Sequence, residues 1–413
     1  MTDKRLDILM ISYWDFQECG MQVIKLTPLY FAKQGHRVTF IVHSETTANP
    51  SMIRDLHPNL TVIRLNLPFK LLNAMPRMRR IRQLLLFSIL SIFHTLRVFS
   101  KGRKPDIIYA AEADAVIIGS LLKRIYNVPL IARFYGIARI TAYFDFETRK
   151  LRSSGFKHLA SRIALTRKAA MTIVTDDGSM GFDVIKAINP HAGDIRFWRN
   201  GIDRNEVLPD IKIKFRRIHA INADDFVLMT ICRLDPMKRV DRAIRALHSL
   251  RGRGIKNVRL LIVGQGEEQE HLEQLSRELG TEKSVEFIGA VTHDSIYEYY
   301  AVADIFLSLY DLSNVGNPLW EALNSSCCIV TLNTGGTGQV IKDGINGRLL
   351  EVGTDEDELA ERLGAAIEEL YNDPDHRRYL SGNAREYSSR NLWTWDERLE
   401  TELKAILNLA GKH

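Results

Sequence analysis

Two cations stand directly behind an apolar run in the second half of the chain. Arg233 follows the run from Phe226 to Cys232, and Lys238 comes just before a helical pattern that starts at Val240. The start of a helix attracts anions, Arg binds phosphate as a fork, and Lys binds it as a point charge. This spacing predicts a diphosphate site; the alternative is a solvated loop whose charges are incidental.

A carboxylate and a glycine extend this candidate site. Glu321 lies early in a helix that we expect to start near Pro318, because proline favours the first turn. There it can accept hydrogen bonds from paired ribose hydroxyls, or it can simply complement the helix dipole. Gly289 ends a strand-like run, where the missing side chain lets a flat ligand approach the backbone. Gly264-Gln265-Gly266 is followed by two glutamates, so it predicts a tight turn and not a phosphate loop.

Parallel sheets must position these residues. Short runs rich in Val and Ile alternate with helical patterns along the whole chain, which is typical of parallel strands joined by helices. The predicted strands are 7–12, 37–42, 61–65, 106–110, 130–134 and 171–175, then 226–231, 258–263, 285–288, 304–309 and 328–332. The pattern predicts an α/β protein with two doubly wound domains, whose ligands lie beyond the carboxyl ends of the strands.

The length also predicts two domains, because 413 residues exceed one ordinary hydrophobic core. The strand pattern lapses and charge accumulates between Asn200 and Arg217. We therefore expect one domain over residues 1–205 and a second domain over residues 206–388. A final helical segment covers residues 389–413.

The order and spacing of several motifs resemble the retaining glycosyltransferases of family 4, which have the GT-B fold. The matching stretches are RNGID, CRLDPMKRVDRAI, LLIVGQGEEQEHL, VEFIGAVTHDSIYEYYAVADIFLSLYD, NPLWEAL and NTGGTGQVIKDGINGRLL, which cover most of residues 198–350. The resemblance implies two Rossmann-like domains that face each other across a cleft, with the final helix crossing back to the first domain. It also implies a hexosyltransferase that takes a UDP- or GDP-sugar and needs neither metal nor cofactor.

The resemblance also assigns roles. Arg233 and Lys238 would act on the donor diphosphate as catalytic residues, Glu321 would bind the ribose, and Gly289 would lie by the base. Backbone amides around Asn317, Pro318 and Leu319 would hold the phosphate.

The sequence departs from the family pattern at one position. The family usually has two glutamates eight positions apart, and the first reaches the hydroxyls of the transferred sugar. Counting back from Glu321 gives Ser313, so Asp311 and Asn314 are the polar substitutes that we expect to bind the donor. A shorter or neutral group there should change the preference for the donor sugar.

The first half offers weaker candidates. Gly20 follows the first strand, where it either approaches the donor phosphate or only starts a helix. Glu112 is the best carboxylate near the anomeric centre, although an acid at a helix start is an equal alternative. Residues expected to line the cleft on the acceptor side are Trp14, Asp15, Arg133 and Tyr135.

Charge is distributed unevenly. Residues 1–205 hold 31 basic and 16 acidic residues, and the segment from Leu56 to Pro105 holds ten basic residues and no acidic one. Within it, the run from Leu84 to Phe93 is apolar but too short to span a bilayer, which needs about 20 residues. The segment predicts contact with an anionic membrane surface, and the alternative is a buried helix with a solvated basic end. We do not expect nucleic acid, because aromatic residues are not interleaved with the cations.

These features define the expected partners and location. The donor is a nucleotide sugar, and the acceptor is a glycan or a lipid-linked saccharide, as in polysaccharide biosynthesis. Four cysteines without metal or disulfide spacing predict a reducing compartment, and no secretory signal is seen. We expect the cytoplasm, with peripheral attachment at the inner face of the membrane. Two alternatives stay open, a UDP-sugar 2-epimerase-like enzyme of the same fold and a non-catalytic nucleotide-sugar-binding partner.

Overall fold

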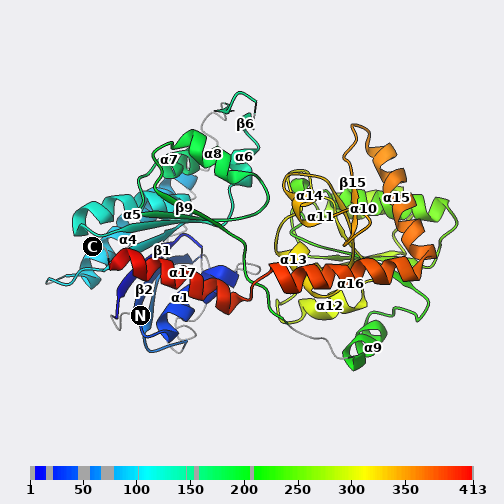
Figure 1. The fold of residues 1–413 in the computed structure, drawn as a ribbon, viewed down its shortest axis with the longest axis horizontal. Helices are drawn as coiled ribbons and strands as arrows, with labels where there is room; N and C mark the ends of the chain where they lie inside the picture. The colour runs from blue at the N-terminus through cyan, green and yellow to red at the C-terminus, as the bar shows by residue number, and fades with distance from the viewer. Residues whose placement is uncertain are drawn as a thin grey trace. The chain divides into compact units, whose positions relative to one another are not determined.

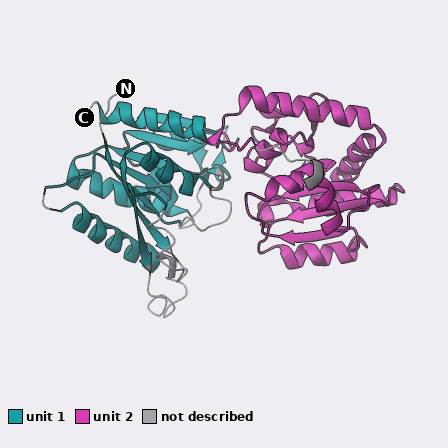
Figure 2. Cartoon of the chain, turned by 90° about the horizontal axis from the view of Figure 1, so that it is seen from below, with its two compact units in different colours: residues 1–176, 181–199, 396–413 teal, residues 177–180, 200–395 magenta. Residues whose placement is uncertain are grey.

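The chain folds into two compact units. The computed structural model describes residues 5–14, 22–44, 56–66, 79–100, 102–145, 147–152, 158–204 and 209–411. Unit 1 contains residues 1–176, 181–199 and 396–413, and unit 2 contains residues 177–180 and 200–395 (Figure 2). These units follow packing and not chain order, and the division at residues 205 and 388 stays a prediction.

Unit 1 is built on a seven-stranded parallel sheet. The strand order is β3-β2-β1-β4-β5-β8-β9. Its strands are β1 (Asp7–Ser12), β2 (Arg37–Ser44), β3 (Leu60–Asn66), β4 (Ile107–Ala111), β5 (Leu130–Phe134), β8 (Met171–Thr175) and β9 (Asp194–Trp198). The order in which strands are added to the sheet reverses between β1 and β4. These two strands are parallel neighbours, and Ile8 is paired with Ile107. Such a switch point opens a crevice at the carboxyl ends of the two strands.

The helices of unit 1 cover this sheet (Figure 1). They are α1 (Gln22–Lys33), α4 (Arg79–Val98), α5 (Glu112–Tyr126), α6 (Ala138–Thr141), α7 (Leu159–Leu165), α8 (Gly181–Ile188) and α17 (Trp395–Ala410). A short hairpin pairs β6 (Phe144–Asp145) with β7 (Lys150–Leu151). The final helix, α17, is tied to the sheet by a buried hydrogen bond of 2.5 Å, which the Tyr109 hydroxyl donates to Glu402.

Unit 2 is built on a six-stranded parallel sheet in the order β12-β11-β10-β13-β14-β15. The strands are β10 (Phe226–Ile231), β11 (Val258–Val263), β12 (Val285–Gly289), β13 (Ile305–Ser308), β14 (Cys328–Leu332) and β15 (Arg348–Leu350). Its switch point lies between β10 and β13, which pair at Leu228 and Ile305. The loops that follow these two strands therefore flank one crevice.

Helices cover both faces of the second sheet. They are α9 (Pro209–Ile218), α10 (Val240–Gly252), α11 (Gln269–Glu278), α12 (Ile296–Val302), α13 (Asn317–Asn324), α14 (Thr337–Val340), α15 (Glu356–Asn372) and α16 (Pro374–Asn391). Leu228 of β10 points into the hydrophobic cluster on one face, whereas Val227 and Met229 point into the cluster on the other. Such two-sided burial is why parallel strands read as continuous apolar runs in the sequence.

The prediction of two doubly wound α/β sheets is confirmed. Runs that are buried on both faces, such as β1, β5 and β10, appear at their predicted positions. The edge strands β9 and β15 were not predicted. Their residues are only partly buried and include Asp194, Arg196 and Arg348, so they lack the apolar run of a central strand.

Candidate functional site

A capped turn presents the two predicted cations after β10. Asp235 accepts a hydrogen bond of 3.1 Å from the backbone N–H of Met237, which starts the 3₁₀ turn Pro236–Lys238. The other oxygen of the same carboxylate accepts a hydrogen bond of 3.1 Å from Nε of Arg233. The Arg233 side chain remains 67% exposed. Asp235, which the sequence analysis did not single out, therefore fixes both the turn and the cation.

Two glycines allow β11 to pack tightly against this turn. A Cβ on Gly264 would lie 1.8 Å from the carbonyl oxygen of Cys232, and a Cβ on Gly266 would lie 2.1 Å from that of Leu234. The Leu234 N–H also donates to the carbonyl of Gln265 at 3.0 Å. Any side chain at either glycine would push the cation-bearing turn away, so the glycines serve packing, in agreement with the predicted tight turn.

Lys238 joins the turn after β10 to the loop after β13. Its Nζ lies 4.0 Å from the centre of the Tyr310 ring, and the Tyr310 hydroxyl donates to the carbonyl of Ile231 at 3.1 Å. Burial lowers the pKa of Lys238, and the charge of Arg233 lowers it further, against the opposing influence of Asp235 and Cys232. A nearby anion would therefore stabilise the charged form of the ammonium group.

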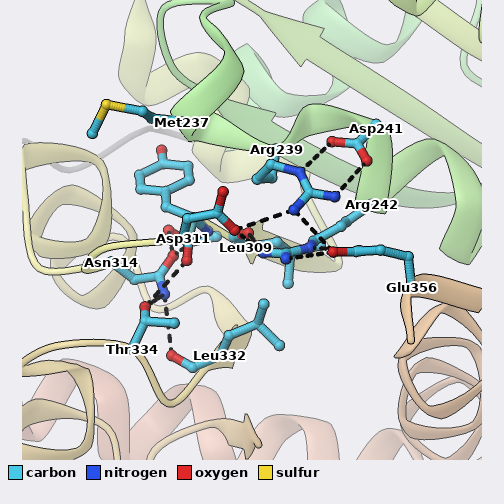
Figure 3. Close-up of polar contacts among 12 residues, drawn as sticks. Met237, Arg239, Asp241, Arg242, Leu309, Asp311, Asn314, Leu332, Thr334 and Glu356 are labelled. Carbon is cyan, nitrogen blue, oxygen red and sulfur yellow. Dashed lines mark hydrogen bonds and ion pairs between the residues drawn. The ribbon is translucent and has the colours of Figure 1, made fainter. Parts of the chain in front are cut away.

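Asn314, which the sequence analysis predicts to bind the donor sugar nucleotide, forms hydrogen bonds within the protein (Figure 3). Its Oδ1 accepts hydrogen bonds of 2.9 Å from the Ser308 hydroxyl and from the Tyr310 N–H. Its Nδ2 donates to the Leu332 carbonyl at 3.1 Å and to the Thr334 hydroxyl at 2.9 Å. The buried amide thus holds the loop after β13, and this geometry favours a structural role.

Asp311, the other predicted substitute, is paired with arginines (Figure 3). Arg239 Nη1 lies 3.2 Å and Arg242 Nη1 lies 2.9 Å from its Oδ1. Arg242 is buried and forms a two-pronged contact with Glu356 at 3.0 and 2.8 Å. The hydrogen bond from Arg242 lowers the pKa of Glu356 to about 2. Asp311 lies at the exposed edge of this network, on the same loop as Ser313.

Ser313 faces the residue-177–180 segment, which follows β8 in the chain but belongs to unit 2. A Cβ on Gly178 would lie 2.5 Å from Oγ of Ser313, and the φ of Gly178 is +68°. The Gly336 N–H donates to the carbonyl of Gly178 at 2.6 Å. Glycines on both sides therefore permit backbone contact beside Ser313.

Helix α13 begins at Asn317, one residue before the predicted start. Gly316 supplies no side-chain cap, and the first N–H groups of a helix have no partner within it. Pro318 has no N–H, so Asn317 and Leu319 supply the amides of the first turn. The Asn317 side chain accepts a hydrogen bond of 2.9 Å from Nδ2 of Asn200, within the RNGID stretch.

Glu321 is buried in the second turn of α13. The Tyr300 hydroxyl donates to Oε2 at 3.0 Å, and Nδ1 of His293 lies 3.9 Å from Oε1. Burial raises the pKa of Glu321 to about 7, although His293 and the Tyr300 hydroxyl oppose that change. His293 was not predicted as a site residue; its position three residues before the start of α12 was the available signal.

Gly289 ends β12 beside β11. Its φ is +79°, a Cβ there would have nothing within 4 Å, and its carbonyl accepts from the Gly264 N–H at 2.8 Å. The open space agrees with a ligand-approach role, and the backbone angle is a second, independent reason for glycine.

In unit 1, Glu112 stands at the switch point, directly after β4. Its φ is +69°, a left-handed conformation that is strained for a glutamate. One carboxylate oxygen accepts a hydrogen bond of 2.7 Å from the Tyr135 N–H, so Glu112 holds the loop after β5. Strained residues concentrate at functional sites, which keeps Glu112 a candidate.

The other candidates of unit 1 have different surroundings. Arg133 is fully buried, donates to the Thr175 hydroxyl at 2.8 Å and lies 4.9 Å from the centre of the Tyr135 ring. It therefore fixes the ends of β5 and β8 and does not line a surface, contrary to the expectation. Trp14 is partly exposed after β1, and its N–H donates to the Ser12 hydroxyl at 3.1 Å. Asp15 and Gly20 lie outside the described residues.

Among the residues that the structure describes, no group of three or more His, Cys, Asp or Glu side chains is arranged to hold a metal ion. The expectation that neither a metal nor a cofactor is required stays a prediction.

Comparison with known proteins identifies the fold. Residues 211–387 match the family Glycosyl transferases group 1. The structure of HepE from Anabaena in complex with UDP-glucose has a TM-score of 0.73 and 20% identity, over 97% of this chain and 100% of that one. The parallel sheets described above are thus those of the GT-B fold, as predicted.

Two curated relatives extend the comparison. An uncharacterized glycosyltransferase of Methanocaldococcus jannaschii is 23% identical over 71% of this chain and 73% of its own length. The GDP-mannose-dependent alpha-(1-6)-phosphatidylinositol monomannoside mannosyltransferase of Mycolicibacterium smegmatis is 29% identical over 48% of this chain and 51% of its own length. The chain thus aligns with only about half of this mannosyltransferase. Residues 211–387 are thus similar to a Glycosyl transferases group 1 domain, and the protein is a transferase enzyme of the glycosyltransferase class.

Proposed function

We propose that the protein is a retaining glycosyltransferase of family 4 that moves a sugar from a UDP- or GDP-sugar to an acceptor hydroxyl. The observation that carries this proposal is the arrangement around the switch point of unit 2. Arg233 and Lys238 follow β10, the amides of α13 follow β13, and the Lys238–Tyr310 contact joins the two loops. Cations and helix amides at one crevice are suited to a pyrophosphate.

The chemistry assigned to these groups is stabilisation of the leaving nucleotide diphosphate. The bond between the anomeric carbon and the phosphate oxygen breaks, and negative charge develops on that oxygen. Preorganised cations stabilise this charge without reorganising during the reaction. The acceptor oxygen bonds to the same face of the anomeric carbon, and its proton passes to the departing phosphate. Glu321 binds the ribose hydroxyls, and Glu112 is the carboxylate that we place nearest the transferred sugar.

The proposal covers two possible bases. The HepE structure contains UDP-glucose, and the mycobacterial mannosyltransferase is GDP-mannose-dependent by name. A panel of UDP- and GDP-sugars, tested by thermal shift, identifies the base, because a ligand that binds the native state raises its melting temperature.

A membrane-associated acceptor, a glycan or lipid-linked saccharide, is the second part of the proposal. One face of α4 is apolar and open to solvent. Its exposed side chains recur at helical spacing and are Leu85, Ile89, Phe93 and Leu96, at 57%, 62%, 57% and 45% exposure. Phe87 on the opposite face is fully buried in the hydrophobic cluster of unit 1, so this helix is already anchored. Within the described residues no helix is long and apolar enough to cross a bilayer.

The basic charge of this region indicates what covers the apolar face. Arg97 and Lys104 are exposed, and the segment from Leu56 to Pro105 contains ten basic residues and no acidic residue, although Asp7 of β1 pairs with Arg103 at 3.7 Å. A helix with an apolar outer face among cations is suited to the surface of an anionic bilayer. The mycobacterial relative, a mannosyltransferase named for phosphatidylinositol monomannoside, supports a lipid-linked acceptor. We place the protein at the cytoplasmic face of the membrane on this basis.

Turnover by the purified protein tests the enzymatic proposal. Donor sugars are incubated with and without acceptor, and free UDP or GDP is measured. Acceptor-dependent release supports transfer, whereas nucleotide release without acceptor, together with an epimerised sugar, would identify a 2-epimerase-like enzyme. Tight binding without turnover would identify a non-catalytic partner of another transferase.

A further inference from the structure

Three ionisable side chains form a line that ends at the ribose-binding candidate. Nε2 of His293 lies 2.8 Å from Oδ2 of Asp203, and Nδ1 of the same ring lies 3.9 Å from Oε1 of Glu321. The exposed fractions of their side chains fall along this line, at 36% for Asp203, 23% for His293 and 7% for Glu321. The imidazole thus separates a partly solvated carboxylate from a buried one.

The protein fixes both ends of this line. Asn324, at the end of α13, donates from Nδ2 to the backbone carbonyl of Asp203 at 3.0 Å. Tyr300 of α12 donates to Oε2 of Glu321, the oxygen that does not face His293. The His293 ring meets Tyr297 edge-on, with ring centres 5.7 Å apart. Each carboxylate is therefore held at a set distance from the imidazole by groups on other elements.

We propose that His293, held by Asp203, is a positioning residue that keeps Glu321 ionised and oriented for the ribose hydroxyls of the donor. This inference rests on the proposed function, because it assigns a partner to the ribose-binding carboxylate. An isolated buried carboxylate takes up a proton, and only the ionised form offers both oxygens as acceptors to two neighbouring hydroxyls. Burial removes the solvent that would stabilise the negative charge of Glu321. A cationic imidazole beside Oε1 stabilises that charge in its place.

The electrostatics agree with this geometry. Burial lowers the pKa of His293, but the hydrogen bond that the ring N–H donates to Asp203 and the charge of Glu321 outweigh burial and raise the pKa overall. Other ionisable groups that act on this pair are Asp294, Tyr297 and Tyr300. The imidazole pKa is raised and the carboxyl pKa is about 7. Both groups therefore exchange protons near neutral pH, and the titration of each depends on the other.

The test compares three ligands by isothermal titration calorimetry at pH 7. UDP and GDP carry ribose hydroxyls, whereas inorganic pyrophosphate engages only the cations. In the variant His293→Gln we expect the affinity for the preferred nucleotide to fall by about tenfold, the range for a charge-assisted contact, with pyrophosphate affinity unchanged. Equal losses for nucleotide and pyrophosphate would show a general structural defect and overturn the proposal.

Two further variants make the result specific. His293→Lys keeps a cation beside Glu321 and should recover part of the lost nucleotide affinity. His271→Gln is the control: it removes an exposed histidine of α11 that contacts Glu268, and nucleotide affinity should not change. In a Glu321→Gln background, His293→Gln should cause no additional loss, because the group on which it acts is gone. An additional tenfold loss in that background would mean that His293 acts elsewhere.

Asp203→Asn covers the case in which His293→Gln unfolds. It retains the size of the side chain but weakens the anchor, so nucleotide affinity should fall by a smaller factor while pyrophosphate affinity stays unchanged. If both variants bind the nucleotide as tightly as the wild type, the role of His293 is overturned, but the proposed function is not. If the wild-type protein binds neither UDP nor GDP, the proposed function itself fails, and the inference fails with it.

Discussion

The ammonium nitrogen of Lys238 lies 4.0 Å from the centre of the Tyr310 ring. This contact joins the loop after β10 to the loop after β13, so the two sides of the switch point form one platform. The aromatic face attracts the cation without neutralising its charge, as a carboxylate would. Lys238 therefore stays available to an anion while its position is fixed.

Arg233→Ala and Lys238→Ala should each reduce transfer about a hundredfold or more, because each removes a preorganised group that faces the leaving phosphate. Initial rates with a saturating donor measure the effect. The matched control is Arg390→Ala, which removes an exposed arginine that pairs with Glu386 on α16. Near-normal rates with Arg233→Ala or Lys238→Ala would contradict the assignment to the diphosphate.

Arg242→Ala should lower the free energy of unfolding by about 2 kcal/mol, because it leaves the buried Leu309 carbonyl without its donor and leaves Glu356 with its remaining contact to Arg239. Arg245 on the same helix pairs with the exposed Asp357 at 3.5 Å, so Arg245→Ala should cost less than about 1 kcal/mol. Urea unfolding of both variants provides the comparison. Equal losses would mean that burial of the Arg242 pair is not what stabilises the loop.

Glu321 should make stability depend on pH. Its folded pKa, about 7, lies above the ordinary value of 4.5, and that of His293 is also raised. Groups with raised folded pKa values stabilise the native state at low pH and lose that contribution as pH rises. Between pH 5 and pH 8, wild-type protein should therefore lose stability relative to Glu321→Gln, by up to about 3 kcal/mol.

Denaturant unfolding at several pH values measures this difference. The Glu321→Gln variant should also bind UDP and GDP more weakly at pH 8, where the wild-type carboxylate is ionised, because a neutral amide replaces the ribose-binding carboxylate. Parallel stability curves for the two proteins would contradict the raised pKa, and unchanged nucleotide affinity would reject the ribose assignment.

The double substitution Ile89→Asp and Phe93→Asp should reduce sedimentation with anionic vesicles about tenfold, because two acidic groups replace apolar area on the outer face of α4. Ile213→Asp is the control, since Ile213 is 70% exposed and lies on α9, a helix of unit 2. Both proteins should unfold at the wild-type temperature. Undiminished sedimentation of the double variant would count against docking through α4.

The sequence predicted the sheets well where burial alone determines them. Phe226 to Ile231 is apolar throughout because both faces of β10 are covered, and a pattern of this kind is visible without a structure. The edge strand β9, by contrast, mixes Asp194 and Arg196 with apolar residues, and its pairing depends on β8 lying beside it. The prediction therefore failed where strand formation depends on a neighbour.

The same distinction applies to the candidate site. Arg233 and Lys238 were predictable, because they follow a recognisable strand and precede a recognisable helix. The partners of Asn314, by contrast, come from separate segments of the chain, and Arg242 contacts Glu356 at a separation of 114 residues. No local spacing indicates such contacts, so the sequence could not show that Asn314 also fixes the loop, and its role as a donor ligand stays a prediction.

The close approach of Gly178 to Ser313 bears on any attempt to broaden donor use by engineering. In the family that the sequence resembles, a glutamate is expected at the position of Ser313, and the backbone carbonyl of Gly178 is already hydrogen-bonded to Gly336. A glutamate introduced at residue 313 would need space that this glycine contact occupies. Under the proposed function, a redesign of sugar selectivity at residue 313 must therefore alter both loops together.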